Sequence, residues 1–488
     1  MKFKILILLL AVLASCSGKD SMDGKREIND YDDLVGYKIA VLNGSMQDIE
    51  LSKRGDLDLM RLNSPSEILA ALESGKADYA VQDSTACIGA NIRQRGITVE
   101  FCNNLGEGGN VAFGFRKDLT ELCSQFNSFL SEIKNNGIFS QIHSRWMTDS
   151  VLSAKMPNFD LPVEGKPIKV GISNNFPSEF VSGDGFAGMD IEIIERFACK
   201  IGRPVEIVCY DFNALSAALV SGKIDIISSF LFVTKERAEK MLFSDIYYIS
   251  RTACFGRDNN SEKVKHGFIK TVSESFHSNL IVEDRWKLIT GGFGETLIIS
   301  FFSIVLGIVL GIPLCLMRMS KKRAAWKSAK AFIDIMQGVP ILIFIMVMFY
   351  IVFAQSHISA RMVAIIAFSI NFGAYVSEVF RSGITGVDKG QTEAGLAMGF
   401  SRTQTFFLFV APQALKQMIP VLKTEILTLV KNTSVVGYIA IQDLAKASDI
   451  IRSRTFDAFF PLIIVSIIYF LLAWLLGKGL DRISKRIR

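Results

Sequence analysis

The chain has 488 residues, and 54 Lys and Arg against 48 Asp and Glu give it a formal net charge of +6. Half of the residues are hydrophobic, 21% are charged, and the mean hydropathy is +0.32. This composition excludes a disordered chain and does not fit an ordinary soluble enzyme. The small positive surplus, without long basic runs, gives no support for nucleic-acid binding. Apolar stretches gather after about residue 285, so we expect a membrane protein with a large water-soluble front half.

The first residues have the pattern of an export signal. Lys2 and Lys4 precede an apolar run over 5–14, which is too short to span a bilayer. The run ends in Leu-Ala-Ser-Cys at 13–16 and resembles a bacterial lipoprotein cleavage box, in which Cys16 would be lipidated. The alternative is an ordinary export signal followed by a coincidental cysteine. Either signal, over residues 1–16, predicts that the front half is exported.

Strand-like and helix-like patterns alternate through the front half and predict an α/β fold. Residues 167–250 resemble the first lobe of a two-lobed bacterial amino-acid-binding protein of the periplasmic binding-protein type II class. Residues 36–150, which come earlier, resemble the second lobe and its returning segment. This order implies a circularly permuted solute-binding domain over 17–258. The alternative is a pair of half domains that do not cooperate.

The same resemblance implies an amino-acid site between the lobes. Arg237 would hold the α-carboxylate, because a planar guanidinium matches a planar carboxylate. Asp83 would accept hydrogen bonds from the α-ammonium group. Gly44 and Ser45 precede a helix and would add donors to the carboxylate. The charged residues could instead lie on the surface.

Aromatic residues both support and complicate this site. Phe176 and Phe212 match positions where family members use rings to sandwich the ligand, although either ring could belong to the core. Phe230 and Phe232 stand where the family has small and hydroxyl residues. They would crowd a pocket for a small polar ligand, so the resemblance allows an altered specificity or a degenerate domain.

After a linker over 259–287, five apolar runs predict five membrane spans within 288–488. The runs cover about 297–316, 333–353, 362–380, a less apolar stretch after 417, and 459–476. Basic residues gather between 318 and 330 and in the tail 481–488. The positive-inside rule places both segments in the cytoplasm, in agreement with an exported front half.

The stretch between the third and fourth runs carries the most specific motif. It contains Glu393-Ala394, then Gly399 and, further on, Pro412, and resembles the cytoplasmic coupling loop of ABC importer permeases. Gly395 replaces the second Ala of that pattern. A short helix ending at a glycine turn would dock on an ATPase subunit and pass its movement to the spans. A plain surface helix between spans is the alternative.

Further motifs resemble the polar-amino-acid branch of the same permease family: 337–340, 374–381 and 431–434. Lys431 matches the family pattern and would face the translocation path. Glu425 does not match it, and could pair with Lys431 or reach the membrane interface.

The two resemblances imply a substrate-binding and membrane-spanning subunit of an ATP-driven importer for a polar amino acid, such as glutamine, glutamate, a basic or a related amino acid. It would be a multi-pass protein of the bacterial inner membrane with a cytoplasmic C-terminus. The sequence has no P-loop motif, so we expect no enzyme activity, no cofactor on this chain, and ATP bound by a separate ATPase subunit. Four histidines without a cluster give no support for a metal site.

One permease half cannot enclose a path alone, so we expect a homodimer. The alternative function is an amino-acid-sensing receptor or scaffold with a degenerate binding domain and no transport. A channel would need a filter-like pore loop, which the sequence does not contain.

Overall fold

The computed structural model describes residues 28, 30–88, 97–101, 109–148, 151, 153–183, 185–257, 268–356, 358–457 and 459–487. The export signal with Cys16, and the linker residues 258–267, lie outside the described residues. The chain divides into two compact units. The α/β unit comprises Met1–Val208, Ile224–Asp284 and Ile450–Phe460. The helical unit comprises Cys209–Lys223, Arg285–Asp449 and Pro461–Arg488.

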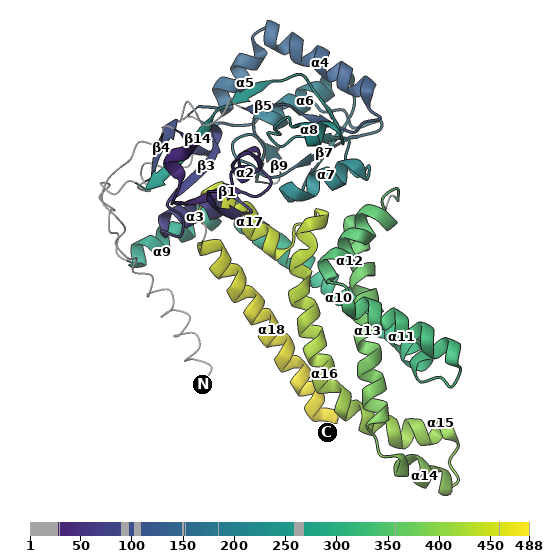
Figure 1. Ribbon diagram of the computed structural model, residues 1–488. Helices are drawn as coiled ribbons and strands as arrows, with labels where there is room; N and C mark the ends of the chain where they lie inside the picture. Colours follow the sequence, from purple (N-terminus) through teal and green to yellow (C-terminus); the bar gives the residue numbers. More distant parts are fainter. Residues whose placement is uncertain are drawn as a thin grey trace. The chain divides into compact units, whose positions relative to one another are not determined.

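The α/β unit contains two five-stranded sheets (Figure 1). The first, which we call the early sheet, has the order β2-β1-β3-β14-β4. Its strands are β1 (Lys38–Leu42), β2 (Asp58–Leu62), β3 (Tyr79–Asp83), β4 (Ile97–Phe101) and β14 (Thr252–Arg257). β1 pairs in parallel with β2 and β3, whereas β14 runs antiparallel between β3 and β4.

The second sheet, which we call the late sheet, has the order β10-β7-β11-β6-β12. Its strands are β6 (Gly114–Phe115), β7 (Ile168–Ile172), β10 (Val205–Cys209), β11 (Ile226–Ile227) and β12 (Leu242–Phe243). β11 is parallel to β7, and β6 runs antiparallel to β11 and β12. The predicted α/β content of the front half is confirmed.

Two short strands lie where the chain passes between the sheets. β5 (Gly109–Val111) follows the early sheet and leads to β6, and β13 (Tyr248–Ser250) follows the late sheet and leads to β14. They pair with each other, with Tyr248 opposite Val111. The early sheet therefore includes β14, which follows the strands of the late sheet in the sequence. The late sheet includes β6, which follows strands of the early sheet.

Helices cover the sheets, and their ends follow simple capping rules. They are α2 (Met46–Ser52), α3 (Pro65–Glu73), α4 (Thr120–Asn135), α5 (Ile138–Trp146), α6 (Met189–Ile201) and α8 (Lys235–Ala238). The Ser45 hydroxyl caps α2, and Ser64 with Pro65 at the first turn starts α3. α6 ends at Gly202, whose φ of 66° favours glycine. The hairpin β8 (Phe180–Ser182) and β9 (Gly185–Ala187) precedes α6.

Helices α4 and α5 share one core with α6, although about 40 residues separate α5 from α6. Phe126 of α4 meets Phe197 of α6 with ring centroids 4.9 Å apart. The buried Glu192 of α6 accepts hydrogen bonds from Trp146 Nε1 at 2.8 Å and from Arg145 Nη1 at 2.5 and 2.6 Å. A buried carboxylate requires such partners, so this contact fixes α5 against α6.

The helical unit consists of long apolar helices and short connecting ones. Its elements are α7 (Phe212–Val220), α10 (Trp286–Arg318), α11 (Arg323–Gly338), α12 (Ile341–Val347), η7 (Met348–Val352), α13 (Ala360–Thr385), α14 (Lys389–Ala397), α15 (Arg402–Thr405), η8 (Phe406–Val410), α16 (Ala411–Asn432), η9 (Thr433–Ile439), α17 (Leu444–Thr455) and α18 (Phe460–Ile487). α17 ends and α18 begins within the segment 450–460, which groups with the α/β unit. α9 (Phe268–Phe276) also belongs to the α/β unit.

Within the described residues, four helices are long and apolar enough to cross a membrane, and a fifth span exists if one bent helix pair counts as a span. That pair, Arg323–Gly338 and Ile341–Val352, bends by 107°. The predicted second span over 333–353 contains this bend, so it is not one continuous helix. Pro340 disfavours helical backbone at the residue before it, and Val339 is extended at φ −95° and ψ 127°.

Candidate functional site

The break before Pro340 forms one wall of a pocket of 480 Å³ inside the helical unit. Residues of α13 and α16 complete the lining. The break contributes Gln337, Gly338, Val339, Pro340 and Ile341, α13 contributes Phe368, Asn371, Phe372 and Tyr375, and α16 contributes Glu425, Thr428, Leu429 and Asn432. Asn371 Nδ2 donates a hydrogen bond to the Met336 carbonyl at 3.0 Å. This bond satisfies a helix-terminal carbonyl next to the break, so the break is stabilised from the neighbouring helix.

The lining of the pocket contains several polar groups and one charge. Asn371, Tyr375 and Asn432 supply amide and phenol groups, and Glu425 alone among the lining residues is charged. A carboxylate in a membrane helix is costly and marks a functional position. An ammonium or guanidinium group would be its natural partner.

The expectations for Glu425 and Lys431 are thereby partly corrected. Both side chains are described, and the structure shows no ion pair between them. Glu425 is half-buried and lines the pocket, whereas Lys431 is exposed and does not belong to the lining. Six residues separate them on one helix, so they lie on different faces. A helical wheel drawn around Asn432, rather than around the family motif, would have indicated Glu425.

The predicted coupling segment is a compact helical knob. Glu393 and Ala394 are exposed on α14, and Gly399 ends the turn after it with φ 86°. Pro412 lies at the start of α16, directly after the π-helical turn η8. Apolar side chains on and after this knob are exposed: Leu396 at 40%, Met398 at 70%, Phe407 at 65% and Leu408 at 57%. Such a patch suits contact with another protein.

The glycine that replaces alanine in this segment has a local cause. Gly395 is buried, and a Cβ built on it would lie 2.6 Å from Thr405 Cγ2 and 2.9 Å from Thr405 Oγ1. Thr405 on α15 therefore occupies the volume that an alanine methyl group would need. The departure from the family pattern preserves the packing of α14 on α15.

In the α/β unit, two predicted ligand residues from opposite sheets meet. Arg237 Nη2 donates to the Gly44 carbonyl at 3.2 Å, and Nη1 donates to the Phe232 carbonyl at 2.9 Å. Burial lowers the pKa of Arg237, although the guanidinium stays charged. Gly44 follows β1 of the early sheet and Arg237 lies on α8, next to the late sheet, so their contact marks the place where the two sheets face each other.

The other polar ligand candidates form hydrogen bonds with neighbouring residues. Asp83 ends β3, and it accepts hydrogen bonds from the backbone N–H of Thr85 at 3.0 Å and from the Thr85 hydroxyl. Gly44 N donates to Asp48 Oδ2 at 3.0 Å, and Ser45 Oγ accepts from Asp48 N at 3.1 Å. Asp48 thus places a carboxylate at the helix end where the sequence predicts a ligand carboxylate. A Ser cap followed three residues later by an acidic residue could have indicated this.

The four aromatic candidates lie in different settings. Phe176 is 5% exposed, and its ring centroid lies 4.9 Å from that of Phe180. Phe212 begins α7, which groups with the helical unit. Phe230 and Phe232 are buried, and a Cβ on Gly109 would lie 2.2 Å from the Phe232 ring. Phe232 therefore packs directly on the crossing strand β5.

A pair of buried carboxyl groups was missed by the sequence reasoning. Glu179 and Asp190 are both fully buried near the late sheet. Asp190 accepts hydrogen bonds from the Tyr247 hydroxyl at 2.7 Å and from Phe230 N at 3.2 Å, and Glu179 accepts from the Ser173 hydroxyl at 3.1 Å. Burial raises the pKa of Asp190 to about 7. Burial, with the nearby Asp190 charge, raises the pKa of Glu179 well above its usual range.

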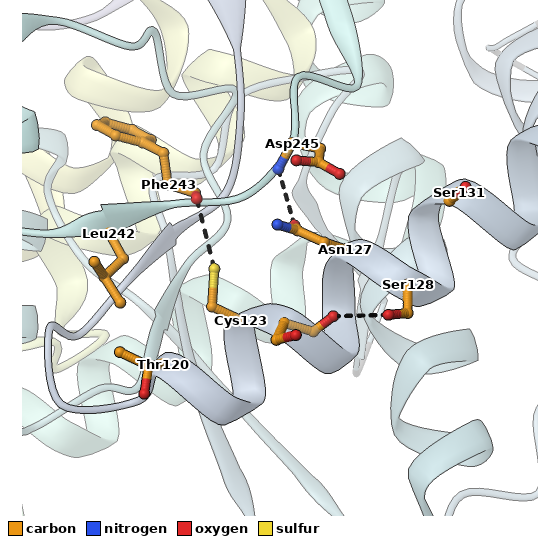
Figure 2. Close-up of a pocket in the computed structure, with 9 residues that line it drawn as sticks. Thr120, Cys123, Asn127, Ser128, Ser131, Leu242, Phe243 and Asp245 are labelled. Carbon is orange, nitrogen blue, oxygen red and sulfur yellow. Dashed lines mark hydrogen bonds between the residues drawn. The ribbon is translucent and has the colours of Figure 1, made fainter.

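A second pocket opens on the surface of the α/β unit, between α4 and β12 (Figure 2). Its volume is 690 Å³, and hydroxyl and amide groups dominate its lining: Thr120, Cys123, Ser124, Asn127, Ser128, Ser131, Leu242, Phe243 and Asp245. Asn127 Oδ1 accepts from Asp245 N at 2.9 Å. None of the predicted ligand residues belongs to this lining.

A family model matches the C-terminal part of the chain. Residues 303–488 match the family model described as "Binding-protein-dependent transport system inner membrane component". The chain is 35% identical over 195 residues to "Probable amino-acid ABC transporter permease protein YckA" of Bacillus subtilis. The matched region covers 40% of this chain and 86% of that protein. It is 30% identical over 220 residues to "L-cystine transport system permease protein TcyB" of Bacillus subtilis, covering 44% of this chain and 94% of that protein.

A solved structure is also similar to part of the chain. It is titled "Crystal structure of an amino acid ABC transporter with histidines", with 29% identity and a TM-score of 0.40, and the match covers 46% of this chain and 100% of that one. The curated relatives are matched over most of their own length, and they are permease subunits rather than enzymes. The chain therefore belongs to the family of amino-acid ABC transporter permeases, the inner membrane components of binding-protein-dependent transport systems.

Proposed function

We propose that the chain is the membrane-spanning subunit of an ATP-driven importer for a polar amino acid and carries its own substrate-binding domain. The observation that carries this proposal is the joint presence, in one chain, of the permease family's region and a pair of similarly ordered sheets. Two sheets of one topology, linked by paired crossing strands, are the architecture of the two-lobed type II binding proteins. The proposed ligands include glutamine, glutamate, basic and related amino acids.

The strand order supports one circularly permuted domain over two separate half domains. Each sheet needs a strand from the other segment, since β14 completes the early sheet and β6 completes the late sheet. Half domains without a partner would lack these strands. The helix contact of Arg145 and Trp146 with Glu192 supports the same pairing.

In this proposal the substrate passes two sites. It first binds between the sheets, where Arg237 would exchange its backbone acceptors for the substrate carboxylate and Asp83 would receive the ammonium group. It then passes the pocket of the helical unit, where Glu425 would attract the ammonium group and the amides of Asn371 and Asn432 would replace water. Lys431 stays a candidate for the path elsewhere on α16.

The remaining parts of the machine are proposals of the same kind. A separate ABC ATPase subunit would dock on Glu393 to Gly399 and hydrolyse ATP, and a homodimer would enclose the path. Export of the α/β unit, lipidation of Cys16 and a cytoplasmic C-terminus follow from the sequence pattern.

The receptor or scaffold alternative has its own support. Phe232 fills space beside β5, and Asp48 already binds the Gly44 N–H. If these contacts persist, Phe232 keeps space beside β5 and Asp48 keeps a backbone donor that a ligand would need. Binding measurements on the full chain separate the two functions.

The test is calorimetric titration of the purified full chain with each common amino acid, for wild type and for Arg237→Ala. We expect one or a few amino acids to bind, and Arg237→Ala to weaken binding about 100-fold, because hydrogen bonds to a charged group contribute roughly 1.5–3 kcal/mol each. Arg203→Ala is the matched control, since Arg203 donates to the carbonyls of Lys166 and Pro167. A folded chain that binds no amino acid would favour the receptor or scaffold.

A second experiment addresses the membrane pocket. Glu425→Gln removes the charge and keeps the volume, so we expect uptake of the identified amino acid into cells to fall about 10-fold while its binding in calorimetry stays unchanged. Lys431→Gln on the same helix is the comparison. Unchanged uptake in Glu425→Gln would remove this pocket from the proposed path.

A further inference from the structure

Two of the membrane helices, α10 and α13, pack side by side over most of their length. They run in the same direction, because residues near both starts meet and residues near both ends meet. At the starts, Arg361 of α13 donates to Glu295 of α10, with Nε 2.9 Å from Oε2. At the ends, Arg318 of α10 lies 3.3 Å, Nε to Oε1, from Glu378 of α13.

Between these ion pairs, small residues bring the two backbones close together. A Cβ on Gly307 would lie 3.1 Å from the Ser369 carbonyl, and one on Gly311 would lie 3.1 Å from the Gly373 carbonyl. Small residues four apart on one face allow such approach in membrane helices. The two helices have little room to slide or separate in the middle.

The end that contains Glu378 is the more elaborate junction. Besides facing Arg318, its carboxylate accepts from Arg381 Nε at 2.8 Å, one turn further along α13. The Arg318 guanidinium also lies 4.7 Å from the ring centroid of Trp326 on α11. The side chains of Arg318, Glu378 and Arg381 are 15%, 25% and 34% exposed, so Glu378 holds two partly buried cations together.

Beyond this junction α13 leads directly into the coupling segment. A Cβ on Gly383 would lie 2.3 Å from Met418 of α16, so the last turns of α13 pack tightly on that helix. α14 begins only four residues after α13 ends. A movement of α14 therefore reaches α13 through this short connection, as well as reaching α15 through the packing of Gly395 on Thr405, and whatever α13 holds moves with it.

We propose that Glu378 is a positioning residue that makes α10 and α13 one rigid element, so that movement imposed on α14 is delivered to α10 as well. This inference rests on the proposed function, because it assigns a role in coupling to the ATPase subunit. Without the carboxylate, Arg318 and Arg381 repel each other and the ends of α10 and α13 separate.

The first experiment measures the junction itself in the full chain and needs no substrate. Spin labels are placed at the exposed positions Leu316→Cys and Ser382→Cys, in a chain whose native cysteines are replaced by alanine, diluted with unlabelled chain. We expect one narrow distance distribution that broadens in Glu378→Gln. It should stay narrow in Glu295→Gln, the matched removal of the ion pair at the other end, and in Glu378→Asp. An unchanged distribution in Glu378→Gln would overturn the proposal.

The second experiment measures coupling. The tagged full chain is purified from its own cells with the ATPase that accompanies it and is placed in proteoliposomes. In Glu378→Gln we expect amino-acid uptake per ATP hydrolysed to fall about 10-fold, with hydrolysis within about twofold of wild type, since coupling energies commonly change ratios by 5–150-fold. Glu378→Asp should restore most of the ratio.

The outcomes separate the inference from the proposed function. An unchanged ratio in Glu378→Gln, or a parallel loss of hydrolysis and of the accompanying ATPase, would overturn the coupling role. Wild-type proteoliposomes that hydrolyse ATP but import no amino acid would refute the proposed function, and the spin-label result would then decide the rigid element by itself.

Discussion

Removal of the buried carboxyl group of Asp190 should abolish much of the pH dependence of stability around the late sheet. Asp190 is fully buried, and its pKa is raised from 3.8 to about 7. The folded state therefore binds more protons than the unfolded state between these values, and stability falls as pH rises through this window. The free-energy cost of ionising Asp190 in the folded state is absent below about pH 4 and complete above about pH 8.

The size of this effect follows from the pKa shift. A shift of about three units, at 1.36 kcal/mol per unit, corresponds to about 4 kcal/mol, of which roughly 3 kcal/mol falls between pH 5 and pH 8. Asp190→Asn cannot ionise and has nearly the same shape. Its amide oxygen can accept from Phe230 N, and its amide nitrogen can donate to a reversed Tyr247 hydroxyl, so both hydrogen bonds have replacements.

Hydrogen exchange of peptides that cover α6 in the full chain is the assay, with rates corrected for the intrinsic effect of pH. We expect the opening free energy of the wild type to fall by roughly 3 kcal/mol from pH 5 to pH 8, and the fall to be clearly smaller in Asp190→Asn. Burial also raises the pKa of Glu195, on the same helix, to about 7, so any fall that remains belongs to Glu179 and Glu195, and Glu179→Gln should remove only the part due to Glu179. A variant Asp190→Asn with the full wild-type fall would refute the reasoning.

Two further predictions concern packing. Glu192→Gln should raise hydrogen exchange in α5 by about 30-fold, because losing the charge that Arg145 and Trp146 bind costs roughly 2 kcal/mol. Glu132→Gln, at an exposed pair with Lys200, should change the exchange by less than about fivefold. Equal effects of the two substitutions would contradict the role of Glu192 in fixing α5 against α6. Gly395→Ala should lower the melting temperature of the detergent-solubilised chain, because overpacking costs about 1–3 kcal/mol, and Thr405→Ala should restore it, since the Thr405 hydroxyl has no hydrogen-bond partner. A loss of the same size in both backgrounds would exclude the steric explanation.

The membrane half illustrates what a hydropathy pattern can and cannot predict. Long apolar runs indicated α10, α13 and α18 because length and composition suffice for a straight helix. The run over 333–353 did not indicate the bend, since apolarity says nothing about backbone geometry and Val339 before Pro340 is extended. The same break produces a wall of the pocket, so the residues that a hydropathy count treats as interchangeable are the ones that shape it.

In the front half, local patterns indicated strands and helices but not how distant strands combine. The α/β alternation was readable because β1 and β7 are short apolar runs. The place of β14 between β3 and β4 depends on contacts across the chain, which no local pattern contains. Burial of Glu179 and Asp190 was equally hidden, since acidic residues near turns are usually exposed.

The contact of Arg237 with Gly44 shows another limit of prediction from the sequence. Resemblance alone brought these residues together, and the structure shows them in contact, yet through a backbone carbonyl rather than through a shared ligand. The partners that they use depend on neighbours such as Asp48, which a motif match does not include.

The strand order also has a consequence for biosynthesis. The early sheet is interrupted until β14 is made, because β4 attaches to it only through β14. Phe101 and Thr252 are roughly 150 residues apart, so at about 5–20 residues per second the ribosome needs on the order of 10–30 s between them. During that interval the edge of β3 is unpaired, and such an edge attracts other strands. The nascent chain would therefore benefit from a holding chaperone until about residue 257 has emerged, just before the first membrane helix is synthesised.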